Sequence, residues 1–263
     1  MERVLVTVSD HVAHVRLNRP DKRNGLDLAM FDALLAAGER VGAERGVRAV
    51  VLSGEGKAFC AGLDWGAFLA SGPEGGRKLL GRDPAKSPAN LAQRACWIWR
   101  EIPVPVVAAV HGATIGGGLQ LALAADVRIL APDAQLSVME VRYGLVPDMT
   151  ATRTLCRLVR PDVARELVYT GRTVGAAEAV ALGLGTRVSE RPLEDALALA
   201  AEIAGRSPDA VRAAKRLLDE AEDLDVAGAF RLETDLQLTL LGTPNQGEAV
   251  QATMGKRSAK FTD

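Results

Sequence analysis

The chain has 263 residues, of which 48% are hydrophobic and 25% are charged, a balance typical of a globular protein with one sizeable core. Its formal net charge of −1 excludes an overall basic surplus for binding nucleic acid or an acidic membrane surface. The three cysteines are widely spaced, so neither a disulfide framework nor a zinc site is predicted, and the cytoplasm is the simplest location.

The first part of the chain predicts two strands, a helix and a third strand. Apolar residues alternate on both sides of Ser9-Asp10, which is typical of a hairpin with one buried face. Helical spacing of apolar residues follows over 28–41, and 47–56 is a short apolar strand. Residues 71–89 are rich in Gly, Pro and charge, and predict a mobile surface loop.

Strands and helices continue to alternate beyond this loop, which predicts an α/β core. The expected segments are helix 90–102, strand 104–112, helix 117–125, and strands 126–132 and 134–140. Residues 105–125 carry no Asp, Glu, Lys or Arg and so imitate a membrane span. Because His111, Gln120 and four glycines interrupt them, we interpret them as a buried strand, a loop and a helix.

From about Pro147 the strand signals largely stop and helices follow one another. Gly, Pro, Asp or Asn bounds each segment. The expected helices are 148–159, 162–170, 175–183, 192–206, 208–222, 225–241 and 245–257. We therefore predict a core over residues 1–200 and a C-terminal helical assembly region over residues 201–263.

Two glycine-rich turns share one design, a strand followed by small residues and the start of a helix. They are GEGKAFCAGLDW (54–65) and HGATIGGGLQLA (111–122). Unpaired N–H groups at a helix start suit negative charge that develops on a carbonyl oxygen. The plainer alternative is a tight connection that needs no side chain. Neither turn has the pattern of a nucleotide-phosphate loop.

Together these stretches resemble the crotonase superfamily, the enoyl-CoA hydratases and isomerases. The matching stretches are LNRPDKRNGLD, GKAFCAGLD, VPVVAAVHGATIGGGLQLALAADVRIL, AQLSVMEVRYGLVPD, LVYTGRTVGAAEAVALGLGTRV and SPDAVRAAKRLL. The resemblance implies a spiral of β-β-α turns with a C-terminal helical region, assembled as a homotrimer or a dimer of trimers. It also implies a coenzyme A thioester substrate whose oxygen lies in an oxyanion hole formed by the N–H groups of Leu63 and Gly117.

The acidic positions decide which reaction the resemblance implies. Hydratases of the family carry two glutamates, and the matching positions here are Gln120 and Glu140. Gln120 can orient a water or a substrate but cannot exchange a proton near neutral pH, and the alternative is a satisfied polar residue near the core. Apolar neighbours should raise the pKa of Glu140 towards the range of a proton-transfer base.

A second acid, Asp148, follows in EVRYGLVPD. This spacing resembles the dienoyl-CoA isomerase branch, in which Glu and Asp move protons between carbons of a conjugated substrate. Mono-enoyl isomerases keep only the glutamate, and FCAGLD resembles their version of the turn. The alternative role for Asp148 is a cap on the helix after Pro147.

The resemblance also implies positions that bind coenzyme A. They are Lys22, Arg23, Ala61, Leu63 and Asp64, with Lys260 and Phe261 reaching a neighbouring subunit's ligand. Lys22 and Arg23 could equally be solvated loop charges. The three histidines are too scattered for a metal site, and Cys60 has no paired His, so neither metal catalysis nor a cysteine nucleophile is predicted.

Three functions are therefore open. The first is an enoyl-CoA isomerase in which Glu140 moves the proton; the second is an enoyl-CoA hydratase with a single glutamate; the third is a non-catalytic acyl-CoA-binding protein. None needs a metal or redox cofactor, because coenzyme A is part of the substrate. Four aromatic residues are candidates for the pocket, an interface or simply the core: Trp65, Phe68, Trp97 and Trp99.

Overall fold

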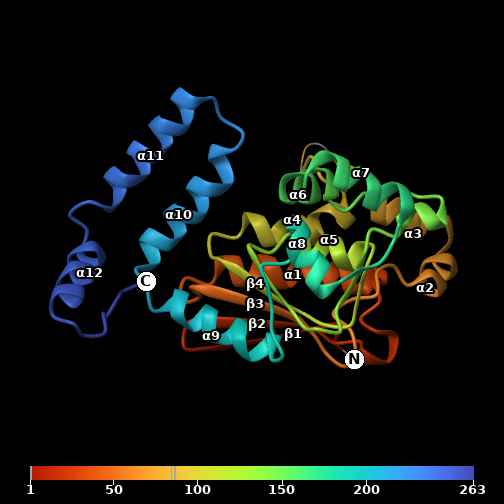
Figure 1. Ribbon diagram of the computed structural model, residues 1–263, viewed down its shortest axis with the longest axis horizontal. Coiled ribbons are helices and arrows are strands. Elements are labelled where there is room, and N and C mark those ends of the chain that lie inside the picture. The colour runs from red at the N-terminus through yellow and green to blue at the C-terminus, as the bar shows by residue number, and fades with distance from the viewer. Residues whose placement is uncertain (1, 84, 86) are drawn as a thin grey trace.

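The computed structural model describes residues 2–83, 85 and 87–263 (Figure 1). Its strands are β1 (Val4–Ser9), β2 (Val12–Leu17), β3 (Ala49–Gly54), β4 (Val106–Val110), β5 (Ala113–Ile115), β6 (Val127–Leu130), β7 (Gln135–Ser137), β8 (Val174–Gly175) and β9 (Arg187–Val188). Its α-helices are α1 (Leu28–Ala43), α2 (Trp65–Ala70), α3 (Gly72–Leu80), α4 (Leu91–Glu101), α5 (Gly117–Leu123), α6 (Ala151–Leu158), α7 (Pro161–Thr170), α8 (Ala176–Leu182), α9 (Pro192–Ala204), α10 (Pro208–Ala221), α11 (Val226–Leu240) and α12 (Pro244–Met254). Two short 3₁₀ helices are η1 (Pro20–Lys22) and η2 (Glu140–Tyr143).

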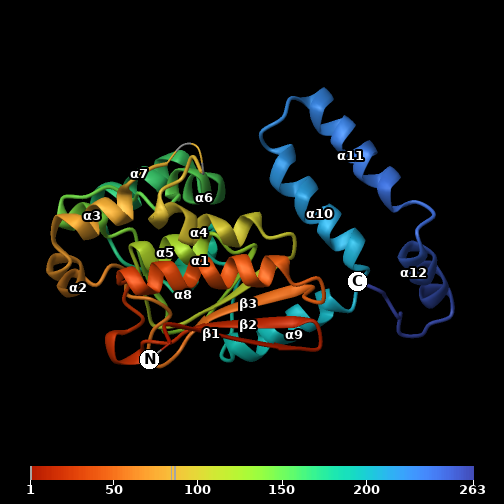
Figure 2. The ribbon, with the colours of Figure 1, turned by 180° about the vertical axis from the view of Figure 1, so that it is seen from behind.

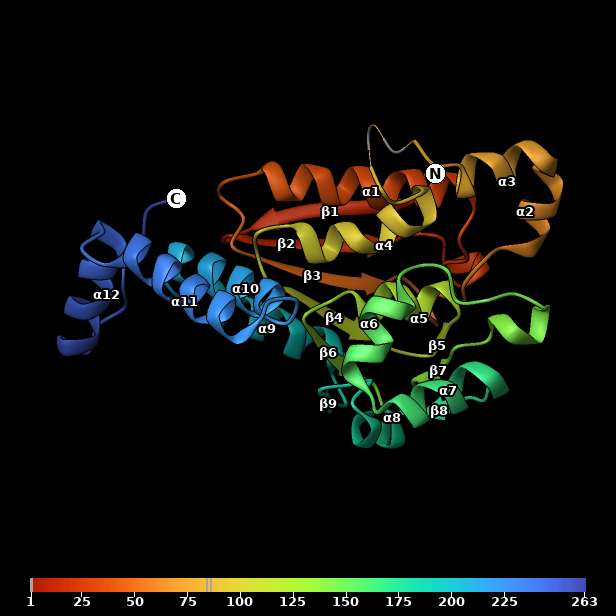
Figure 3. The same ribbon diagram turned by 90° about the horizontal axis from the view of Figure 1, so that it is seen from above.

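A six-stranded sheet with helices on both faces forms the centre of the molecule (Figure 3). Its order is β1-β2-β3-β4-β6-β9, and every pair except the β1-β2 hairpin is parallel. Alternate residues of a strand point to opposite faces, so Leu52 of β3 packs in the core beneath α1 and α4, whereas Val51 packs beneath α9. This two-sided burial explains the continuous apolar runs of β3 and β4.

The chain winds as a spiral of strand, strand and helix. β4, β5 and α5 form one turn, and β6 and β7 begin the next. β4 pairs with β6 in the large sheet, while β5 pairs with β7 in a second, three-stranded sheet, so successive turns stack in register. The predicted α/β class and spiral are confirmed, and the apolar stretch 105–125 folds as a buried strand, a short strand and a helix.

The predicted N-terminal hairpin is confirmed, and so is the helix that follows, which begins after Asp27 caps it through the N–H of Met30. The mobile loop predicted over 71–89 is wrong in its first half, because 72–80 is helix α3. Leu79 is buried on this helix, which gives a segment rich in Gly and charge one apolar anchor. Residues 84 and 86 lie outside the described residues.

Helices α10, α11 and α12 extend away from the sheet as a separate arm (Figures 1 and 2). Its root is tied to the core by the buried Lys215, whose Nζ lies 2.7 Å from Asp126 Oδ2. Its end is tied by Arg48, whose guanidinium donates to Asp263 and to the carbonyl of Phe261. Helix α9, which packs on the sheet, ends at Ala204, beyond residue 200, and the division into two regions stays a prediction.

Candidate active site

A cavity of about 400 Å³ lies where the two glycine-rich turns meet η2 and the segment before α6. Ala61, Gly62 and Leu63 line it from the first turn, and Gly116 and Gly117 line it from the second. The rest of its wall is largely apolar, with two carboxylic acids, Glu140 and Asp148, and the residues Phe31, Trp65, Phe68, Leu79, Leu80, Ala92, Ile115, Met139, Tyr143, Leu145, Val146 and Met149. The cavity is thus a mostly apolar site with a few converging polar groups.

Leu63 and Gly117 both line this cavity. Leu26 donates its N–H to the carbonyl of Gly62 and accepts a hydrogen bond from the N–H of Asp64. Leu63 lies between these two residues, so its own N–H points away from Leu26. Gly117 is the first residue of α5, where an N–H has no partner within the helix. A Cβ built on Gly62 would lie 3.7 Å from the Gly117 nitrogen, so the two turns are in contact.

Close packing explains the three consecutive glycines. A Cβ on Gly118 would lie 2.1 Å from the carbonyl oxygen of Cys60, and one on Gly117 would lie 2.6 Å from the sulfur of Met149. A Cβ on Gly116, whose φ is +54°, would lie 3.2 Å from Glu140 Oε1. The bare backbone therefore lets α5 begin between the first turn and the Glu140 carboxyl.

Glu140 begins η2 and has one engaged and one free carboxylate oxygen. Its Oε1 accepts a 2.7 Å hydrogen bond from Gln120 Nε2. Its Oε2 is buried and has no hydrogen-bond partner among the described residues. Desolvation raises the pKa of Glu140, the hydrogen bond from Gln120 lowers it, and the charge of Asp148 raises it. The predicted upward shift therefore has its expected cause, a buried carboxylate.

Gln120 lies behind Glu140 on α5, buried to 1% exposure, and the residues that line the cavity do not include it. Its Oε1 accepts hydrogen bonds from the N–H groups of Met149 at 2.8 Å and Ala151 at 3.1 Å. Its amide thus connects Glu140 to the start of α6. The contacts fit a satisfied polar residue and leave its oxygen no free role in holding a water.

Asp148 lines the cavity, and burial of its carboxyl raises its pKa. The chain folds back between the two acids and brings Glu140 and Asp148 to one cavity, although they are eight residues apart. The alternative that Asp148 caps the following helix is wrong. Thr150 is the N-cap of α6, and no side chain at that position makes the capping hydrogen bond.

Comparison with known proteins decides the family. The family model described as enoyl-CoA hydratase/isomerase matches residues 7–263. The chain belongs to this family. The mitochondrial Delta(3,5)-Delta(2,4)-dienoyl-CoA isomerase of Homo sapiens is 34% identical over 97% of this chain and 80% of its own length. A crystal structure of enoyl-CoA hydratase from Bacillus anthracis is 31% identical over 98% of each chain, with a TM-score of 0.91.

A second solved structure, enoyl-CoA hydratase from Mycobacterium smegmatis, is 30% identical and covers 98% of each chain, with a TM-score of 0.87. The predicted membership of the crotonase superfamily is therefore confirmed, and the protein is an enzyme of the hydratase/isomerase kind. Relatives named as isomerase and as hydratase both match along nearly the whole chain. The family alone leaves the choice between the two reactions open.

The positions expected to bind coenzyme A in this family member fall into two places. Ala61 lines the cavity, and its N–H donates to the carbonyl of Arg23, so Lys22 and Arg23 lie near the first turn with exposed side chains. Asp64 has structural partners, because it caps α2 and forms an ion pair with Arg19 at 2.7 Å. These contacts account for the lowered pKa of Asp64.

Lys260 and Phe261 lie on the C-terminal tail and not in the cavity wall. The Lys260 N–H donates to Glu248, and the Phe261 carbonyl accepts from Arg48. Their predicted contact is with a neighbouring subunit's ligand, and the single chain does not test it.

Sequence reasoning missed Tyr143 and Arg19. The Tyr143 ring lies against Trp65, with centroids 4.9 Å apart, and joins η2 to α2 at the cavity. Arg19 connects the first turn to α1 through Asp64 and Asp27. Both belong to stretches that carry the family resemblance, but only their tertiary contacts distinguish them from solvated residues.

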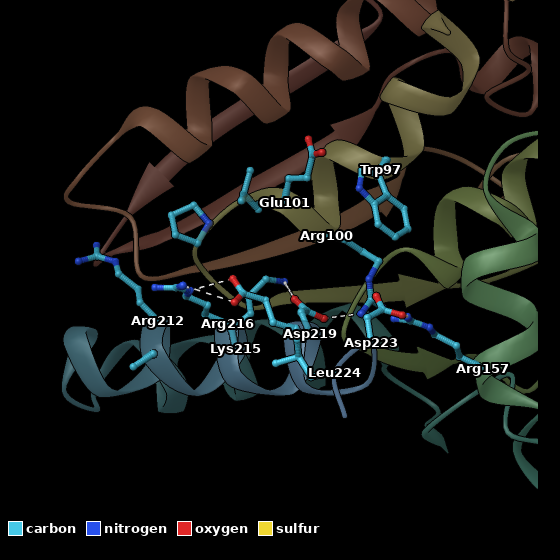
Figure 4. Close-up of a pocket in the computed structure, with 14 residues that line it drawn as sticks. Trp97, Arg100, Glu101, Arg157, Arg212, Lys215, Arg216, Asp219, Asp223 and Leu224 are labelled. Carbon is cyan, nitrogen blue, oxygen red and sulfur yellow. Dashed lines mark hydrogen bonds and ion pairs between the residues drawn. The ribbon is translucent and has the colours of Figure 1, made fainter. Parts of the chain in front are cut away.

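The four aromatic candidates take three different roles. Trp65 and Phe68 line the cavity, whereas Trp99 is fully buried in the core. Trp97 borders a second hollow, of about 690 Å³, between α4 and α10 (Figure 4). Three of its acidic side chains pair with basic ones, among them Asp219 with Arg100. This hollow, although larger, is lined mainly by charged side chains and does not include the two glycine-rich turns, so it does not have the chemistry of the first cavity.

Cys60 is buried, and desolvation raises its pKa to about 12, so its thiol is protonated at neutral pH. Within the described residues, no group of His, Cys, Asp and Glu could hold a metal ion. No described helix is long and apolar enough to cross a membrane.

Proposed function

We propose that this enzyme is an enoyl-CoA isomerase in which Glu140 moves a proton along the acyl chain of a coenzyme A thioester. The observation that carries this proposal is that Oε2 of Glu140 is buried without a hydrogen-bond partner among the described residues and lies close to Gly116, the residue before Gly117. One base next to two amide donors can remove a proton from a carbon next to a thioester carbonyl and return it further along the chain.

The reaction uses the two turns as an oxyanion hole. The thioester oxygen accepts hydrogen bonds from the N–H groups of Leu63 and Gly117, which stabilise the negative charge that forms when C2 loses its proton. Each such donor contributes about 3 to 4 kcal/mol in other enzymes. Glu140 Oε2 takes the proton from C2 and delivers it to C4, and the double bond moves from C3 to C2. No net oxidation occurs, so the step needs no redox cofactor, and coenzyme A enters only with the substrate.

The contacts of Gln120 disfavour the hydratase alternative. Hydration requires a water held for attack by two groups, and here the second position is an amide whose oxygen already accepts two backbone N–H groups. A hydratase with one glutamate would have to hold its water by Glu140 alone. General acid and base help is typically worth about 100- to 10,000-fold, so slow hydration is the expected side reaction.

Assembly and location belong to the same proposal. Helix α11 of the arm exposes Val226, Phe230 and Leu238 by 62–69% of their surface, which fits a helix that packs against another copy of the chain. We keep the predicted homotrimer or dimer of trimers, and the cytoplasm as its location.

Two assays on one preparation test this function. We expect conversion of a 3-enoyl-CoA to exceed hydration of a 2-enoyl-CoA by orders of magnitude, and Glu140→Gln to lower the first rate by about 100- to 10,000-fold. Fast hydration that depends on Glu140 would refute the isomerase and favour the hydratase. Tight thioester binding without turnover in the unmodified protein would favour the non-catalytic alternative.

The raised pKa of Glu140 also predicts how activity and stability depend on pH. The base works only when ionised, so activity should fall as the pH drops through its raised pKa. Folding disfavours the ionised form of an acid whose pKa it raises, so this group costs stability above its folded pKa. Glu140→Gln should therefore be the more stable protein at neutral pH, and the difference should disappear below the ordinary Glu pKa.

A further inference from the structure

We propose that Gln120 is a positioning residue, an amide bridge that holds Glu140 and the Asp148 segment in one arrangement and leaves Glu140 Oε2 as the oxygen that moves the proton. This inference rests on the proposed function of Glu140. It assigns to Gln120 no contact with the substrate. Its basis is three hydrogen bonds made by one buried side chain.

The two ends of the amide face opposite partners. Nε2 is the only donor end, and it lies 2.7 Å from the carboxylate oxygen Oε1 of Glu140. Oε1 of Gln120 is the acceptor end, and it receives two backbone N–H groups. Exchanging the two ends would place oxygen against oxygen and nitrogen against N–H, so the network permits one orientation. An ionised glutamate at this position could accept from the backbone but would have no proton to donate to Glu140.

The segment that the bridge holds is bent unfavourably. Thr150 has φ +82°, a conformation that a β-branched residue rarely adopts, and its buried hydroxyl has no hydrogen-bond partner among the described residues. The two N–H groups that donate to Gln120 belong to Met149 and Ala151, on either side of this residue. Gln120 therefore stabilises the bend that follows Asp148 in the cavity wall.

The bridge also acts on the charge of Glu140. Its hydrogen bond favours the ionised carboxylate, against desolvation and the charge of Asp148, which favour the protonated form. The buried thiol of Cys96 on α4 interacts electrostatically with both acids, and burial raises its pKa well above the ordinary value, so it stays neutral. Removing the donor should leave Glu140 harder to ionise and free to turn.

Two variants separate the two ends of the bridge. Gln120→Glu keeps an acceptor for Met149 and Ala151 but loses the donor to Glu140, whereas Gln120→Leu loses both. Gln237→Glu, on an exposed face of α11, is the matched control for the added charge. The readouts are denaturant unfolding, kcat and KM for the 3-enoyl-CoA, and the titration of Glu140 by NMR of ¹³C-carboxyl-labelled glutamate, assigned with Glu140→Gln in each background.

We expect Gln120→Leu to unfold well below the midpoint of the unmodified protein, and Gln120→Glu to unfold below it by an amount that grows with pH, because it places a second carboxylate against Glu140. In both variants the pKa of Glu140 should rise, and the acidic limb of the pH profile should shift to higher pH. We expect kcat to fall about 10- to 100-fold while KM changes less than about twofold. An unmoved titration with unchanged kcat in both variants would overturn the proposal, as would equal unfolding midpoints. The titration needs no turnover, so it tests the bridge even if the unmodified protein isomerises nothing and the proposed function fails.

Discussion

Replacing Gly62 with alanine tests whether the two glycine-rich turns form one site. Gly62 has φ +83°, and a Cβ there would lie 2.6 Å from the carbonyl oxygen of Ile115. The left-handed conformation costs alanine about 1–2 kcal/mol, and relieving the overlap costs about 1–3 kcal/mol, so the free energy of unfolding should fall by about 3 kcal/mol. The Ile115 carbonyl must move by about half an ångström, which displaces the Gly117 N–H that follows it. Losing one such donor lowers kcat by about 100- to 1000-fold.

The assay is urea unfolding together with kcat for the 3-enoyl-CoA. The matched control is Gly242→Ala, because Gly242 has φ +77° on the arm and an added Cβ there meets no described atom within 4 Å. The control should lose only the conformational part, about 1–2 kcal/mol, and keep its kcat. A Gly62→Ala protein that turns over at the rate of the unmodified enzyme would refute the convergence of the two turns on one oxygen.

Three further predictions concern the second acid, the root of the arm and the assembly. Asp148→Asn should slow isomerisation of a conjugated dienoyl-CoA by about 100- to 10,000-fold but spare a mono-enoyl substrate, and equal losses in steady-state assays would contradict separate roles for the two acids. Lys215→Met removes the ion-pair partner of Asp126, which keeps only the N–H of Val106, and should destabilise the fold by about 3 kcal/mol in urea, whereas Arg216→Met, in an exposed pair, should leave the midpoint unchanged. Phe230→Asp should shift the mass measured by light scattering from trimer or hexamer to monomer, and an unchanged mass would remove α11 from the interface.

The predicted site residues differed in how far local sequence determined them. Leu63 and Gly117 were predicted from the family resemblance. Gly117 is the first residue of α5, whereas the direction of the Leu63 N–H depends on the pairing of its segment with Leu26. Glu140 follows from an apolar stretch that must be buried. Asp64 shows the limit of such reasoning, since its charge is taken by Arg19, and no spacing rule reveals that pair.

The sequence by itself determined the α/β class and the two turns, because each depends on periodicity or on residue type over a few neighbouring positions, whereas the role of Glu140 was predicted from the family resemblance. Only the tertiary structure decided that Asp148 faces the cavity and does not cap α6, that 72–80 is helical, and that Gln120 bridges Glu140 to Met149 and Ala151. These features depend on hydrogen bonds that stabilise a bend of the chain such as the one at Thr150. The partners in these hydrogen bonds are up to 31 residues apart in the sequence. Side-chain hydrogen bonds over such separations leave no periodic pattern in the sequence, so geometry alone assigns them.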